Sequence, residues 1–173
     1  INGIIDSLNY YKIDLNNKKI AVIGAGGAAI AVIYALQKIL KKYDITIFNK
    51  TINNINNLIS KFNYNINYNV MPFLKDNILY NYDFIFITIP NAHQYLNNIN
   101  FNKNSIIFFA DYKNFEFINF VKSQVDTVIT GEYWLINQAI PAFEIFTDIK
   151  LCDNKKNKII KELFNIVNIE NIN

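Results

Sequence analysis

Three of the chain's five glycines lie within four positions, in the stretch Gly24–Ala29 that reads GAGGAA. The stretch follows a short apolar run, Lys19–Ile23, and precedes a long segment without glycine or proline. This order predicts a buried strand, a tight turn and a helix, and the turn fits the dinucleotide-binding pattern G-x-G-x-x-A. Gly24 would permit the turn, Gly26 would let a diphosphate approach the main chain, and Ala29 would let the helix pack on the strand. The first N–H groups of the helix would then bind the diphosphate.

A second candidate binding segment, Asn49-Lys50-Thr51, follows the next predicted strand, Asp44–Phe48. We call this segment the tip of that strand. NAD-specific sheets place a carboxylate at this point, where it hydrogen-bonds the ribose 2′-hydroxyl. The present tip has no carboxylate, and Lys50 would instead offer a positive charge to a 2′-phosphate. The two groups together predict NADP as the cofactor. The alternatives are a glycine turn that serves packing alone and a solvated surface lysine.

Alternating strands and helices would position these groups. Further apolar runs predict strands at Asp83–Ile89, Ser105–Ala110 and Asp126–Ile129, with a weaker strand that closes at Val70. Apolar spacing predicts helices at Ala29–Leu40, at Ile52–Phe62 with Thr51 as its cap, at Gly131–Phe146 and at about Asn154–Val167. Pro141 should kink or break the third of these helices. The order predicts an α/β fold, a Rossmann-type doubly wound and mostly parallel sheet with helices on both faces.

Length and composition narrow the classes of protein. The chain has 173 residues, enough for one domain with its own core. No apolar run reaches the roughly twenty residues that span a bilayer, and no signal-peptide pattern opens the chain. The net charge of +3 comes from scattered lysines without a basic face, so we expect no nucleic-acid partner. The single cysteine, Cys152, cannot form an internal disulfide, and we expect a cytoplasmic protein without membrane partners.

A third motif lies further along the chain. The stretch Gly131–Ala139, GEYWLINQA, with Phe143 and Phe146 beyond it, resembles the Gly-x-x-Met-Leu-x-x-Gln-Ala stretch of shikimate dehydrogenases and its trailing Phe and Trp. GAGGAA resembles the phosphate loop of that family, and Asn49–Thr51 resembles its Asn-Arg-Thr motif with lysine for arginine. The spacing is preserved, so essentially the whole chain resembles the C-terminal NADP-binding domain of shikimate dehydrogenase. The glycine turn is common to many dehydrogenases, whereas the Gln-Ala stretch is more particular.

The resemblance implies NADPH-dependent reduction of 3-dehydroshikimate to shikimate, a step toward chorismate and the aromatic amino acids. We expect no metal site. The resemblance implies that the cofactor is bound by Gly24, Ala25, Gly26, Gly27, Ala28, Asn49, Lys50, Thr51, Asn54, Tyr112 and Gly131, the last near the nicotinamide. Tyr112 is ambiguous between a cofactor and a substrate contact, because the match to the family's Asp-x-x-Tyr segment is shortened after it. Gln138 would hydrogen-bond a substrate hydroxyl, the alternative being a polar residue that caps a helix face.

The departures from the family concern the catalytic groups. The family's catalytic lysine lies in an N-terminal substrate domain that this chain lacks, so we expect no catalysis by the chain alone. By spacing, Ile1-Asn2-Gly3 aligns with the last three positions of the family's Asn-Thr-Asp-Gly motif and places Asn2 at the catalytic aspartate. An amide cannot serve as an acid or a base. His93, the single histidine, is interpreted as an exposed loop residue and not as a proton carrier.

The chain begins with isoleucine, which suggests processing or excision from a longer protein. We expect residues 1–173 to form a single NADP-binding domain, with a core over about 1–130. The helical segment over 131–173 would pack back toward the missing substrate domain, which would share the small-molecule substrate. Two alternatives stay open, a catalytically decayed domain that binds a nucleotide or a partner protein, and a related quinate/shikimate dehydrogenase. Glutamyl-tRNA reductase is disfavoured by the stretch around Gln138.

Overall fold

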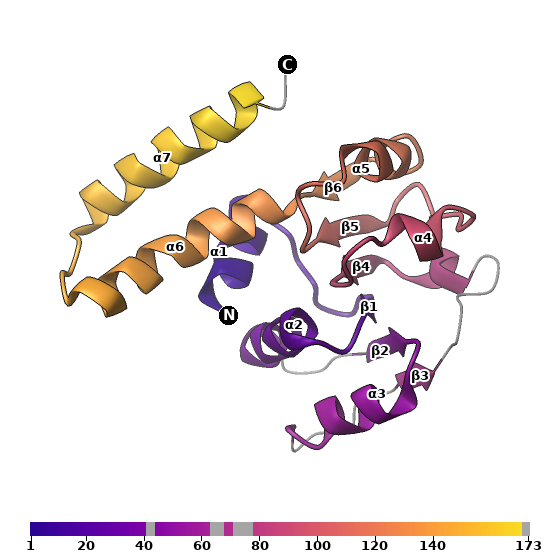
Figure 1. Ribbon diagram of the computed structural model, residues 1–173. Coiled ribbons are helices and arrows are strands. Elements are labelled where there is room, and N and C mark those ends of the chain that lie inside the picture. Colours follow the sequence, from indigo (N-terminus) through magenta and orange to yellow (C-terminus); the bar gives the residue numbers. More distant parts are fainter. Residues whose placement is uncertain (41–43, 63–67, 71–77, 171–173) are drawn as a thin grey trace. The chain divides into compact units, whose positions relative to one another are not determined.

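The computed structural model describes residues 1–40, 44–62, 68–70 and 78–170 (Figure 1). The chain divides into two compact units. The larger unit is Asp14–Gly131, and the smaller unit combines Ile1–Ile13 with Glu132–Asn173.

The larger unit is built on a six-stranded sheet. Its strands are β1 (Lys19–Ile23), β2 (Asp44–Asn49), β3 (Tyr68–Val70), β4 (Phe84–Ile87), β5 (Ile106–Phe109) and β6 (Thr127–Ile129). They lie in the order β3-β2-β1-β4-β5-β6, and each pair of neighbours is parallel. The predicted Rossmann-type fold is confirmed. The order reverses between β1 and β4, where sheets of this class bind their ligands.

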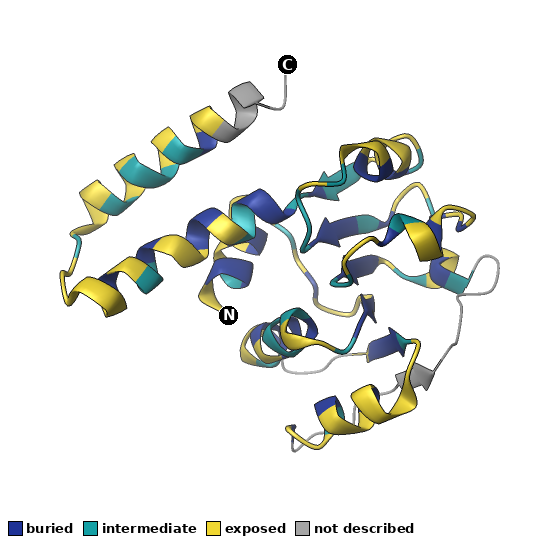
Figure 2. Ribbon diagram, in the orientation of Figure 1, coloured by how far each residue is buried: buried dark blue, intermediate teal, exposed yellow. Residues whose placement is uncertain are grey.

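Continuous apolar runs explain why these segments form central strands. All four residues of β4 are at most 1% exposed, and Figure 2 shows β1, β4 and β5 mostly in the colour of buried residues. Strands of a parallel sheet are covered on both faces, so they are apolar at successive positions. The polar residues that follow each apolar run therefore lie at the ends of the strands.

Helices cover this sheet. They are α2 (Gly27–Ile39), α3 (Ile52–Ile59), the short 3₁₀ helix η1 (Ile78–Asn81), α4 (His93–Leu96) and α5 (Phe115–Lys122). Ala29, Ile33 and Leu36 form the predicted buried face of α2. In α3 the predicted face is only partly right, because Ile55 is buried whereas Ile52 is 50% exposed.

The smaller unit consists of helices, α1 (Asn2–Tyr10), α6 (Gly131–Thr147) from its second residue onward, and α7 (Asp153–Glu170). Tyr133 joins all three, with ring centroids 5.2 Å from Tyr10 and 4.4 Å from Phe164. Tyr11 packs on the same ring at 4.9 Å, and burial together with a hydrogen bond to Tyr133 raises the pKa of Tyr11 well above its ordinary value. In the described part of the chain, no helix is both long and apolar enough to cross a membrane.

Of the kink or break predicted at Pro141, the break is wrong, because α6 continues through Pro141 to Thr147. A proline inside a helix removes one hydrogen bond and costs about 3 kcal/mol. Ile136 and Ile140, on the turns before it, are each only 6% exposed. Packing of an apolar face supplies most of the stability of a helix in a protein, and here it offsets the local loss.

Glu144 joins α6 to the start of α7. Its Oε1 accepts the Leu151 N–H at 2.8 Å and lies 3.0 Å from Lys156 Nζ. The backbone hydrogen bond from Leu151, with Lys156 second, lowers the pKa of the Glu144 carboxyl. The ionised carboxylate is therefore favoured by folding.

We expect Glu144→Gln to lower the melting temperature at pH 7. A folded-state pKa below the unfolded value stabilises the protein fully above the unfolded value, about 4.3 for glutamate, and the contribution is lost as the pH falls through the folded value. The difference between variant and wild type should therefore shrink in acid. Glu162→Gln is the control, because Glu162 is exposed and 3.9 Å from Lys158 and should contribute little. Equal melting temperatures at pH 7 would contradict this account.

Candidate functional site

The turn after β1 requires glycine at its first position. Gly24 has φ +117°, which side chains rarely adopt, and its N–H donates to the Phe48 carbonyl at 2.7 Å. A Cβ there would lie 2.5 Å from Thr88 Oγ1 and 2.9 Å from Ile89 Cγ2. The segment after β4 thus packs directly against the turn.

The next two glycines of the turn are different, because they border open space. A Cβ on Gly26 or Gly27 would meet no atom within 4 Å, and both residues are exposed. Gly26 is the N-cap of the 13-residue helix α2, and it has no side chain that could bind the first N–H groups. An open helix N-terminus attracts anions, so the turn fits a diphosphate.

The predicted tip of β2 lies beside this turn. Ile23 and Phe48 are register partners, so Gly24, directly after β1, and Asn49, the last residue of β2, lie at the same ends of neighbouring strands. Asn49 Nδ2 donates to the Thr51 carbonyl at 2.9 Å, which shapes the tip. Thr51 is the N-cap of α3, as predicted, although its side chain makes no capping bond. Lys50, Thr51 and Asn54 are exposed.

The end of β5 contributes Tyr112 and the neighbourhood of Gly131. Asp111 Oδ1 accepts the Lys113 N–H at 3.0 Å, and Lys113 Nζ lies 5.8 Å from the centre of the Tyr112 ring. Gly131 is buried against the main chain, because a Cβ there would lie 2.8 Å from the Ala110 carbonyl carbon. The turn, the β2 tip and these residues all lie at the carboxyl ends of parallel strands. The structure therefore brings them to one side of the sheet, which we call the carboxyl edge.

Asn2 and Gln138 belong to the smaller unit. Asn2 is exposed at the start of α1, and Gln138 is exposed on α6. Gly3 explains the close packing of these helices, since a Cβ there would lie 2.9 Å from the Trp134 carbonyl oxygen and 3.1 Å from Gln138 N.

Sequence reasoning missed a polar pair at the carboxyl edge. The interpretation of His93 as an exposed loop residue is wrong, since it begins α4, is half-buried, and has Nδ1 2.6 Å from Asn114 Nδ2. Asn114 is also the N-cap of α5, because its Oδ1 accepts the Phe117 N–H at 3.3 Å. An asparagine before an apolar helix is a capping signal that could have located half of this pair.

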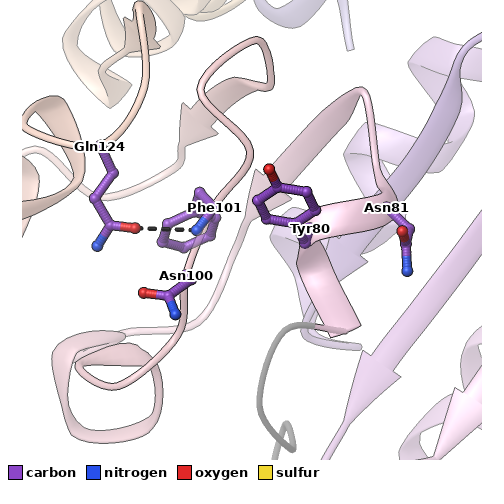
Figure 3. A pocket seen from close by; sticks show the side chains of 5 residues that line it. All are labelled: Tyr80, Asn81, Asn100, Phe101 and Gln124. Atoms are coloured by element: carbon purple, nitrogen blue, oxygen red, sulfur yellow. Dashed lines mark hydrogen bonds between the residues drawn. The ribbon is translucent and has the colours of Figure 1, made fainter.

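A pocket of about 580 Å³ lies at the opposite edge, before β4, β5 and β6 begin. It is lined by Tyr80, Asn81, Asn100, Phe101 and Gln124 (Figure 3). The amide of Gln124 is used internally, because it accepts from Phe101 N at 3.0 Å and donates to the Ile99 carbonyl at 3.5 Å. Figure 3 also shows the Asn81 side chain turned away from the other four residues. The carboxyl edge therefore remains the candidate site.

Known proteins are similar to this chain in sequence. The family model described as "Shikimate / quinate 5-dehydrogenase" matches residues 7–111. The shikimate dehydrogenase (NADP(+)) of Nitrosopumilus maritimus is 27% identical over 92% of this chain and 61% of its own length. The enzyme of the same name from Methanosphaera stadtmanae is 29% identical over 84% of this chain and 55% of its own length.

The solved structures agree in fold. The shikimate dehydrogenase of Aquifex aeolicus superimposes with a TM-score of 0.68 at 24% identity, over 91% of this chain and 59% of that one. The chain thus spans between 55% and 61% of the length of the two curated relatives. The family match covers more than half of the chain, and the predicted resemblance is confirmed: the chain belongs to the shikimate / quinate 5-dehydrogenase family.

Proposed function

We propose that residues 1–173 form the NADP-binding domain of an enzyme that reduces 3-dehydroshikimate to shikimate with NADPH, on the route to chorismate and the aromatic amino acids. The observation that carries this proposal is the open main chain at Gly26 and Gly27, at the N-terminus of α2. Both curated relatives are named shikimate dehydrogenase (NADP(+)), which supports the same cofactor here.

The residues of the carboxyl edge have distinct roles in this proposal. The first N–H groups of α2, over Gly26–Ala28, bind the diphosphate without a charged side chain. Lys50, with Asn49, Thr51 and Asn54, binds the adenosine 2′-phosphate. Tyr112 and the main chain around Gly131 border the nicotinamide, which in its reduced form supplies the hydride.

The substrate half of the reaction rests on other groups. Gln138 hydrogen-bonds a substrate hydroxyl in this proposal, and the proton is transferred by a lysine of the substrate domain outside the chain. Asn2, aligned with the family's aspartate, motivates the alternative of a decayed domain that only binds a nucleotide or a partner. Assay of the full-length gene product with NADP⁺ and either shikimate or quinate separates these cases. Oxidation of shikimate would end the alternative, and faster oxidation of quinate would change the substrate.

Lys50 tests the choice of cofactor. We expect Lys50→Ala to weaken NADPH binding by about 10- to 100-fold, because a hydrogen bond to a charged group contributes about 1.5–3 kcal/mol. The affinity for NADH should not change, since NADH has no 2′-phosphate. Titration of both nucleotides, followed by nicotinamide fluorescence, measures the ratio.

Lys38→Ala is the matched control for this titration. Lys38 lies in the last turn of α2, at the end opposite the glycine turn, so its loss removes the same charge far from the proposed site. A wild-type chain that binds NADH as tightly as NADPH would contradict the proposal. Equal losses of NADPH affinity in the two variants would assign the effect to net charge and not to Lys50.

A further inference from the structure

The contact between Asn114 and His93, the single histidine of the chain, favours one tautomer of the imidazole ring. The amide of Asn114 has a defined orientation, because its Oδ1 accepts the Phe117 N–H at 3.3 Å. Its Nδ2 therefore faces His93 Nδ1, at 2.6 Å. An amide nitrogen can only donate, so Nδ1 accepts and the ring proton lies on Nε2. His93 thus offers an N–H donor on the side of its ring away from Asn114.

His93 follows the strand that borders the ligand-binding point of the sheet. The strand order reverses between β1 and β4, and ligands of such sheets bind outside the carboxyl ends there. Thr88, directly after β4, donates through its hydroxyl to the Ile23 carbonyl at the end of β1 at 2.7 Å. The same hydroxyl occupies the space that a Cβ on Gly24 would need. The segment that leads from Thr88 to His93 therefore starts against the glycine turn.

The strand order also indicates which half of a dinucleotide lies near His93. β2 and β4 flank β1 on opposite sides. The tip of β2, with Lys50, takes the adenosine end in the proposed function, so the other half extends over the ends of β4 and β5. That half offers ribose hydroxyl and phosphate oxygens, which accept hydrogen bonds from an imidazole N–H.

We propose that His93 donates a hydrogen bond through Nε2–H to an oxygen of the nicotinamide half of the bound dinucleotide. Asn114 is the positioning residue that keeps the proton on Nε2. This inference rests on the proposed NADP site and adds a binding residue to it. The resemblance to the family assigned no role to either residue.

Two substitutions of His93 separate the two sides of the ring. In His93→Asn the short amide can occupy the place of Nδ1 and keep the contact with Asn114, but the far donor is lost. In His93→Gln the longer amide can place an N–H near the position of Nε2, while the contact with Asn114 is lost. A purely structural histidine would make the first variant the milder one, whereas a ligand-binding histidine makes it the more damaging for cofactor binding.

The measurement compares NADPH with adenosine 2′,5′-bisphosphate, which lacks the nicotinamide half. We expect His93→Asn to weaken NADPH binding about tenfold, the size of one hydrogen bond, and His93→Gln to lose clearly less. Neither variant should change the affinity for the bisphosphate. Wild-type affinity for NADPH in His93→Asn, or an equal loss in both variants, would overturn the inference. If the wild-type chain binds neither ligand, the proposed function fails and the inference with it.

The ¹⁵N signal of His93 Nε2 provides a readout on cofactor binding that a purely structural role would not affect. The imidazole ¹⁵N spectrum contains the signals of one histidine, so Nδ1 and Nε2 can be assigned directly. We expect a single Nε2–H tautomer in the free chain and a shift of that Nε2 signal when NADPH is added. Asn114→Ser keeps a good N-cap for α5 but removes the amide donor, so it should give mixed tautomers and weaker NADPH binding. An Nδ1–H tautomer in the wild type would contradict the assignment.

Discussion

Gly26→Asp is expected to abolish NADPH binding while the fold remains as stable as in the wild type. A Cβ at Gly26 meets no atom within 4 Å, and its φ of −88° and ψ of −168° suit any residue. Aspartate is a favourable N-cap and complements the positive end of α2. Its carboxylate would occupy the place of the diphosphate and repel it. We expect at least a ~100-fold loss of affinity, because several charge-assisted hydrogen bonds are lost together.

Gly26→Asn and Gly24→Ala are the matched controls. Asparagine also caps the helix but carries no charge, so it separates blocking of the site from repulsion. Gly24→Ala should instead unfold more easily, by about 1–3 kcal/mol, because Gly24 has a positive φ and its Cβ would contact Thr88. Thermal melts and NADPH titrations distinguish the positions. Tight NADPH binding by Gly26→Asp would contradict the proposed site.

Gly131→Ala should destabilise the chain by about 1–3 kcal/mol, the usual cost of overpacking. The added Cβ would lie 2.8 Å from the Ala110 carbonyl carbon and 3.2 Å from that of Asp111. These are main-chain atoms, so no side-chain rotation relieves the contact. The end of β5 or the start of α6 must therefore move. Tyr112 lies close to the end of β5 in the sequence. Urea unfolding measures the free-energy difference.

Gly27→Ala is the control for this prediction. It makes the same change at the first position of α2, where a Cβ meets no atom within 4 Å. Alanine is a better helix former than glycine, so this variant should be as stable as the wild type or slightly more stable. If Gly131→Ala unfolded at the same urea concentration as Gly27→Ala, the close approach to Ala110 would be refuted.

The sheet could be predicted from the sequence because its strands are continuous apolar runs. The FIFI of β4 has no helical or alternating pattern, and its burial on both faces follows from that composition. α2 was equally readable, because its apolar residues recur on one face. α1, α4 and α5 were not predicted. α4 has only 4 residues, which make too few turns to show a period.

The glycine turn of the candidate site could be predicted from the sequence, because residue type determines its main-chain conformation. Glycines after a buried strand indicate a turn, and the positive φ at Gly24 confirms it. The open space at Gly26 leaves room for the expected diphosphate, whose binding there stays a prediction. The link between His93 and Asn114 could not be predicted, because it joins residues 21 positions apart, at the starts of α4 and α5, that only the strand order brings together. The close approach of Gly131 to Ala110 has the same origin. Such contacts depend on tertiary structure and not on local pattern.

An NMR titration of the ¹⁵N-labelled chain with NADP⁺ tests the central claim most directly, because the five glycine amides lie in a sparsely populated region of the spectrum and can be resolved. The account predicts the largest shifts at Gly26, Gly27 and Lys50. Signals around the pocket at Tyr80 and Gln124, on the opposite edge of the sheet, should stay in place. Unchanged amides at Gly26 and Gly27 with saturable shifts near Tyr80 would contradict it.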